Sequence, residues 1–196
     1  MSTPENYAAF ADSELILQSD LIQVARRIKS LVDARDPRTL LVFAHPTGMQ
    51  IDLDLRGSLD DVLATLYRAT PEPTSAEETK RRSPGRPKLG VVGREVTLLP
   101  RHWDWLNAQP GGASVALRKL VEQARKGNQG ADRVRQSREA AFRFMSAIAG
   151  NQPGFEEASR ALFGGKAADF EAQTQPWPND VRDFARNLAA PSFDSE

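Results

Sequence analysis

The residues most able to do chemistry in this sequence are cations gathered into one short stretch, residues 80–88, which reads KRRSPGRPK. Its nine residues hold five Lys or Arg side chains with two prolines and a glycine, a composition that disfavours helix and strand. Residues 80–138 carry 14 Lys or Arg against 4 Asp or Glu, whereas residues 1–79 carry 7 against 13 and residues 139–196 carry 5 against 9. A formal net charge of zero therefore hides a basic centre between acidic flanks. Because such a centre attracts polyanions, we expect DNA as a partner.

The sequence offers little for catalysis. Only His45 and His102 could act as bases near neutral pH, and neither has a nucleophile or a metal-binding neighbour in its pattern. The chain has no cysteine, which excludes a thiolate nucleophile and a zinc-cysteine site. Four aspartates have structural explanations on the solvent face of an alternating strand or in the first turn of a helix: Asp52, Asp54, Asp60 and Asp61. We therefore expect no enzyme, no cofactor and no metal site.

Targeting and membrane segments are not evident. The start, MSTPENYAAF, lacks the basic and apolar regions of a signal peptide, and no apolar run approaches the length of a membrane span. We expect a cytoplasmic protein at the nucleoid, without a membrane partner.

The elements that must position the basic centre indicate an α+β fold in three parts. Residues 1–69 predict a small α+β domain in the order ββαββα, with strands at 7–10, 15–17, 39–44 and 50–55, a helix over 21–34 and a second helix after Ser58. Residues 70–93 predict a basic linker, and residues 94–127 predict a DNA-binding segment. Residues 131–196 predict an all-helical C-terminal region, with helices over 131–149, 154–163 and 165–173 and one opened by Pro178.

The DNA-binding segment predicts a strand over 94–99, a short helix opened by Pro100, a break at Gly111-Gly112 and a helix over 114–126. This order resembles the ribbon-helix-helix fold of bacterial repressors. The resemblance implies a homodimer in which the strands of two chains pair as an antiparallel ribbon that enters the major groove. It also implies a phosphate at the start of the second helix, at Ala113, Ser114 and Val115.

Alternation along the predicted strand assigns its two faces. The favoured register directs Val96 and Leu98 inward onto the helices and directs Glu95 and Thr97 toward base edges. The apolar residues expected to meet the inward face are Trp103, Leu106, Leu117, Leu120 and Val121. Leu99 is apolar as well, which keeps the opposite register open. Thr97 stands where the resembled family has an arginine or lysine, so base-specific readout is expected to be weak.

Residues 84–88, PGRPK, resemble the core of an AT-hook, which lies along the minor groove of A·T-rich DNA. Pro84 replaces the usual arginine, so the resemblance covers half of the motif. Its position before the predicted strand favours a minor-groove arm with Arg86 inserted. The candidate DNA-binding residues are Arg81, Arg82, Gly85, Arg86, Pro87, Lys88, Arg94, Glu95, Thr97, Arg101, Ser114, Arg118 and Lys119.

A resemblance to one bacterial family covers nearly the whole chain. It is carried by YAAFA at 7–11, DLDLRG at 52–57, GRPKLGVVGREVTLLPRHWDWL at 85–106, GGASVALRKLVEQAR at 111–125, and the later segments FRFMSAIAG and FEEASRALF. The family is domain of unknown function 2239 (DUF2239), and the resemblance implies a shared architecture without an activity.

The function that we expect from the residues is a homodimeric DNA-binding transcriptional regulator. An architectural nucleoid protein and a protein interaction module remain alternatives. A protein or small-molecule partner of the terminal regions is left open.

Overall fold

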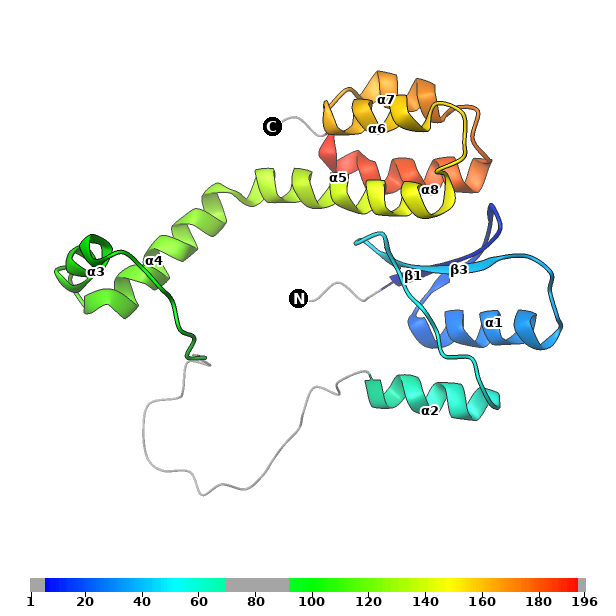
Figure 1. Ribbon diagram of the computed structural model, residues 1–196, viewed down its shortest axis with the longest axis horizontal. Coiled ribbons are helices and arrows are strands. Elements are labelled where there is room, and N and C mark those ends of the chain that lie inside the picture. Colours follow the sequence, from blue (N-terminus) through cyan, green and yellow to red (C-terminus); the bar gives the residue numbers. More distant parts are fainter. Residues whose placement is uncertain (1–5, 70–91, 194–196) are drawn as a thin grey trace. The chain divides into compact units, whose positions relative to one another are not determined.

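The computed structural model describes residues 6–69 and 92–193 (Figure 1). It divides into two compact units, each described by itself: residues 1–71 together with 130–196 form unit 1, and residues 72–129 form unit 2. Unit 1 contains a four-stranded sheet and most of the helices. The predicted α+β class and the predicted ββαββα order of the N-terminal elements are confirmed.

The sheet of unit 1 is antiparallel, with strand order β2-β1-β3-β4. Its strands are β1 (Asn6–Ala11), β2 (Glu14–Ser19), β3 (Leu40–His45) and β4 (Met49–Gln50). Central strand β1, NYAAFA, is buried on both faces. Ala8 and Phe10 belong to one apolar cluster, and Tyr7 and Ala9 belong to another. Because successive strand residues point to opposite faces, β1 supplies both cores.

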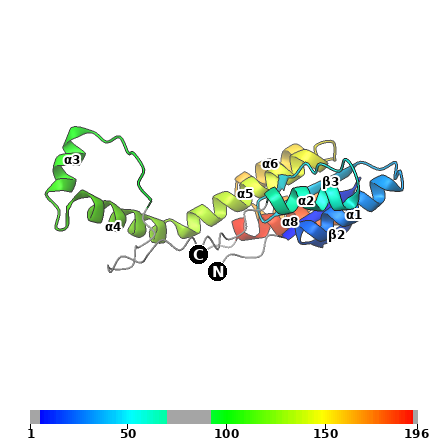
Figure 2. The same cartoon turned by 90° about the horizontal axis from the view of Figure 1, so that it is seen from below.

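One sheet face is covered by α1 (Leu21–Asp33), and α2 (Leu59–Ala69) lies beside α1. Both helices lie in front of the sheet in the view from below (Figure 2). Asp20 caps α1 as predicted, because its Oδ1 accepts a hydrogen bond of 2.9 Å from the Gln23 backbone N–H. Val24 and Ile28, one turn apart, then pack against Val42 of β3.

The predicted strand over 50–55 is shorter in the structure, where β4 ends at Gln50. The Ile51 N–H donates to the Val42 carbonyl at 2.8 Å, and the next residues have no strand structure. Ile51, Leu53 and Leu55 nevertheless pack against the cluster beneath α1. The alternating pattern therefore predicts correctly which side chains are buried, but the backbone hydrogen bonds to β3 do not continue past Ile51.

The other sheet face is covered by helices from the end of the chain (Figure 1). Helices α5 (Gln129–Ile148) and α8 (Asn179–Ala189) lie next to the sheet, and α6 (Phe155–Phe163) and α7 (Ala167–Thr174) lie on the far side of them. The 3-10 turn η1 (Ala190–Ser192) follows α8. Phe144 of α5 is fully buried, and its ring centroid lies 5.4 Å from Phe10, 4.8 Å from Phe43 and 4.7 Å from Phe184. The composition-based division placed residues 1–69 and 131–196 in separate regions, whereas the structure joins them through one aromatic core. The physical reason is that α1 covers only one face of the sheet, so Phe10 and Phe43 need helices on the other.

An ion pair beyond the end of α1 predicts a pH-dependent contribution to stability. Arg38 contacts Asp36 at 2.7 Å and Glu14 of β2 at 2.7 Å. Hydrogen bonds from Arg38 lower the pKa of the Asp36 carboxyl from its ordinary 3.8 to about 2. A carboxyl with a lowered pKa in the folded state stabilises that state above its ordinary pKa, and the stabilisation is lost as pH falls toward about 2.

We expect Asp36→Asn to lower the urea midpoint of unfolding at pH 7, with a difference from wild type that shrinks as the pH falls below about 4. The control is Asp54→Asn. Asp54 pairs with Arg56, but the Arg56 side chain is 90% exposed, so a smaller effect is expected. An Asp36→Asn effect of the same size at low and neutral pH would contradict this assignment.

Candidate nucleic-acid interface

The two predicted helices of unit 2 are present as α3 (Pro100–Asn107) and α4 (Gly112–Gly127), and they pack on each other. Leu99 has an extended backbone and precedes Pro100, which opens α3 at a position where a missing N–H costs nothing. Gly111 has a φ of 87°, and a Cβ there would lie 3.2 Å from the Val115 side chain. A residue with a side chain would be strained at this turn, so the glycine break has a local cause.

The strand predicted over 94–99 is absent: residues 92–99 have no strand structure in the described chain. A lone extended segment cannot satisfy its own backbone N–H and C=O groups, so a strand exists only beside a partner. A single chain supplies one half of any two-chain ribbon.

Much of the apolar surface in the described part of unit 2 is not buried within that unit. Among its described residues, the buried hydrophobic side chains are Leu106 and Ala116. The predicted inward residues divide into three groups: Leu106 is buried, Leu98, Trp103 and Leu117 are half-buried, and Val96, Leu120 and Val121 are exposed. Val92, Leu99 and Trp105 are exposed as well. An apolar surface of this kind on so small a unit is typical of a protein interface.

The start of α4 is open to an anion. Gly112 has a φ of 74°, and a Cβ there would meet no atom within 4 Å. In the described residues no side chain caps this end of α4, and its first turn holds no acidic residue. The first-turn N–H groups at Ala113, Ser114 and Val115 therefore lie at the positive end of the helix dipole without a side-chain cap from the described residues.

Four of the predicted DNA-binding cations lie in the described part of unit 2: Arg94, Arg101, Arg118 and Lys119. All are exposed, and none of them forms an ion pair with a described residue. The Arg118 Nε donates to the Ser114 carbonyl at 3.1 Å, which holds its guanidinium beside the first turn of α4. At the other end of the same helix, Arg125 and Lys126 lie 3.2 Å and 4.0 Å from Glu122. Within α4, Arg118 is thus held near the first turn, Lys119 lies at the middle, and the cations paired with Glu122 lie near the end.

The other predicted DNA-binding residues are either exposed in unit 2 or outside the described residues. Glu95, Thr97 and Ser114 are exposed. Six lie outside the described residues: Arg81, Arg82, Gly85, Arg86, Pro87 and Lys88. The AT-hook-like arm therefore stays a prediction from sequence.

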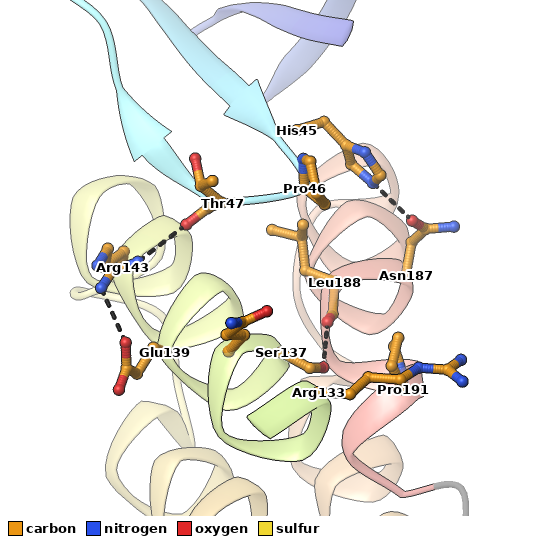
Figure 3. Close-up of a pocket in the computed structure, with 11 residues that line it drawn as sticks. His45, Pro46, Thr47, Arg133, Ser137, Glu139, Arg143, Asn187, Leu188 and Pro191 are labelled. Atoms are coloured by element: carbon orange, nitrogen blue, oxygen red, sulfur yellow. Dashed lines mark hydrogen bonds and ion pairs between the residues drawn. The ribbon is translucent and has the colours of Figure 1, made fainter. Parts of the chain in front are cut away.

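Unit 1 contains a cavity of about 390 Å³ that sequence reasoning missed (Figure 3). It lies between the turn at residues 45–47, α5, and the end of α8 with η1. Its lining residues are His45, Pro46, Thr47, Arg133, Gln136, Ser137, Glu139, Arg143, Asn187, Leu188 and Pro191. His45 and Asn187 are 142 positions apart, so no local spacing could have identified the cavity.

Residues 6–69 and 92–193 were compared with the requirements for a metal site and for a membrane-spanning helix. Within these ranges no group of His, Cys, Asp and Glu side chains could hold a metal ion. Asp54 pairs instead with Arg56, and the Asp61 carboxylate accepts from the Ser58 hydroxyl and backbone N–H. None of the described helices combines the length and apolar character needed to cross a membrane.

The comparisons with known proteins found one family. The family described as "Uncharacterized protein conserved in bacteria (DUF2239)" matches the chain over residues 6–189. No curated protein and no solved structure matches the chain significantly.

Proposed function

Because the chain belongs to this bacterial family, whose description states no activity, we propose a function from the residues themselves: a homodimeric DNA-binding protein that regulates transcription. The observation that carries the proposal is the open start of α4. There an uncapped first turn without acidic residues lies beside Arg118, whose Nε donates to the Ser114 carbonyl, and the exposed Lys119 follows Arg118 in the helix. A helix start of this kind binds a phosphate of the DNA backbone through its N–H groups.

The dimer follows from the uncovered apolar residues of unit 2. In the proposal, residues 94–99 of two chains pair as an antiparallel ribbon, which provides the partner strand that one chain lacks. The exposed Val96, Leu120 and Val121 then become buried against the second copy. Dimerisation and formation of the DNA-binding surface are one event.

Each predicted contact has a role in this arrangement. Arg94, Arg101, Arg118 and Lys119 neutralise phosphates, which sets affinity and salt dependence. Thr97 and Glu95 face base edges from the ribbon, where a carboxylate can accept from cytosine. Arg86 of the preceding arm enters the minor groove of A·T-rich DNA, with Arg81, Arg82 and Lys88 on flanking phosphates.

We test the phosphate role by measuring binding of a labelled A·T-rich duplex by fluorescence anisotropy between about 50 and 200 mM salt. The double variant Arg118→Ala/Lys119→Ala removes two proposed contacts per chain. We expect weaker binding at every salt concentration, and a plot of log affinity against log salt that becomes shallower by about one for each lost contact.

The matched control is Arg125→Ala/Lys126→Ala, which removes the same Arg-Lys dipeptide from the end of the same helix, where Glu122 already pairs with it. This variant should retain most of the affinity. Equal weakening by both double variants would show attraction by net charge without a defined contact site, and no duplex binding by wild type would overturn the proposal.

A second candidate, an architectural nucleoid protein, is favoured by the ribbon residues. Exposed Thr97 stands where an arginine or lysine that reads bases would be expected, and exposed Glu95 repels phosphates, so the same contacts act with little sequence preference. The ratio of affinities for a selected and a random duplex at one salt concentration separates the two functions. A ratio near one assigns the architectural role.

A further inference from the structure

The cavity of unit 1 combines an apolar floor with polar groups around its opening (Figure 3). Leu188 is buried, and Pro46 and Pro191 add further apolar surface. Gln136, Arg143 and Asn187 bring polar side chains to the opening from α5 and α8. A volume of about 390 Å³ falls within the range of small-molecule sites.

Hydrogen bonds that cross between the walls hold the cavity open without a ligand. The Ser137 hydroxyl of α5 donates to the Leu188 carbonyl of α8 at 2.6 Å, and Arg143 donates from Nη1 to the Thr47 carbonyl at 3.2 Å. A Cβ on Gly48, beside this turn, would lie 2.0 Å from the Ala140 carbonyl oxygen, so the turn contacts the α5 backbone directly. Turn, α5 and α8 are therefore fixed relative to one another, which is the condition for a preformed site.

Donors remain available at the opening. A guanidinium has five N–H groups, and Arg143 makes two hydrogen bonds within the described residues, to the Thr47 carbonyl and to Glu139 at 3.0 Å. The Asn187 Oδ1 accepts from His45 Nε2 at 3.1 Å, and the His45 ring packs on Phe184. With Oδ1 engaged in this way, the Asn187 amide NH₂ can donate to a guest.

The donors at the opening determine what kind of guest fits. Arg143 pairs with Glu139 at 3.0 Å, and its N–H groups beyond those bonded to Glu139 and the Thr47 carbonyl make no hydrogen bond with a described residue. A group that accepts hydrogen bonds is therefore preferred over a cation, while the apolar floor favours a compact hydrocarbon body. A planar carboxylate suits the forked geometry of an arginine.

We propose that this cavity is a binding site for a small monocarboxylic acid with an aromatic or branched aliphatic body. The carboxylate lies against Arg143, and the apolar body lies on Leu188 and Pro191. This proposal is independent of the proposed DNA contacts in unit 2, because all residues that line the cavity belong to unit 1. A failure of one proposal can therefore be told apart from a failure of the other.

The experiment titrates the full chain with benzoate, phenylacetate and isovalerate and with the neutral primary amide of each acid. Backbone amide signals are followed by nuclear magnetic resonance. We expect at least one acid to shift the signals of His45, Thr47, Gly48, Asn187 and Leu188, with the corresponding amide binding roughly tenfold or more weakly.

Two variants assign the contact. Arg143→Gln is expected to lower the affinity for the acid roughly tenfold or more. Asn187→Ala is expected to lower this affinity by a smaller factor. The control Arg135→Gln removes an exposed arginine of the same helix that pairs with Asp132 and does not line the cavity, so it should leave binding unchanged. The proposal is overturned if no acid shifts these signals, if acids and amides bind equally, or if Arg143→Gln binds as wild type does.

Discussion

Replacing Phe144 with alanine is expected to destabilise unit 1 by about 3–5 kcal/mol, the usual cost of truncating a buried aromatic residue. Phe144 is fully buried, and its ring contacts Phe10 and Phe43 of the sheet and Phe184 of α8. Urea unfolding followed by circular dichroism measures the loss. Because the sheet and the C-terminal helices share this core, hydrogen exchange should show β1 and α8 losing protection together.

Phe142→Ala is the matched control for this measurement. Phe142 is two residues earlier in the same helix and 37% exposed, with rings of Phe155 and Phe163 at 6.4 Å and 5.4 Å. Its truncation should cost about 1 kcal/mol, the scale of a partly exposed aromatic contact. If Phe144→Ala left β1 protected while α8 lost protection, the two ends of the chain would be separate domains and the shared core would be wrong.

Placing a charge at Val121 is expected to abolish the proposed dimer. Val121 is 63% exposed in the single chain and lies on the α4 surface that the second copy would cover. An unpaired carboxylate buried there costs roughly 3 kcal/mol or more, which weakens the dimer by over a hundredfold. Analytical ultracentrifugation of wild type and Val121→Asp across a concentration series measures the dissociation constant.

Gln123→Asp provides the charge-matched control, since it adds the same carboxylate to an exposed position on the other side of α4. The control should dimerise like wild type. Monomeric wild type at all accessible concentrations would exclude the homodimer, and equal dissociation of both variants would attribute the effect to net charge.

Local patterns predicted most single elements of this fold. Asp20 identified the start of α1, and Pro100 identified the start of α3. Apolar spacing identified the helices from α5 to α8. These signals could be used because caps, prolines and periodicity act within one or two helical turns. The short β4 and the missing strand at 94–99 show the limit of such patterns. Alternation reports which side chains are buried, whereas a strand also needs a partner for its backbone.

The parts of the structure that depend on distant segments could not be predicted. Phe10 and Phe144 are recognisable as core residues, but nothing in their spacing says that they meet. The cavity has the same origin, because His45, Arg143 and Asn187 come together only when turn, α5 and α8 do. The exposed cations Arg118 and Lys119 of α4 were predictable, since glycine and charge patterns there are local.

The sharing of one core by the two ends of the chain also has a consequence for biosynthesis. Phe10 and Phe43 leave the ribosome long before Phe144 and Phe184 are made, and at about 5–20 residues per second the interval between Phe43 and Phe144 is about 5–20 seconds. During this time the sheet face that α5 and α8 will cover is exposed to water, and the whole of unit 2 is translated. Unit 1 can complete its fold only when α8 emerges. A nascent chain that stops before that helix would expose the aromatic side chains of this sheet face, which chaperones can bind.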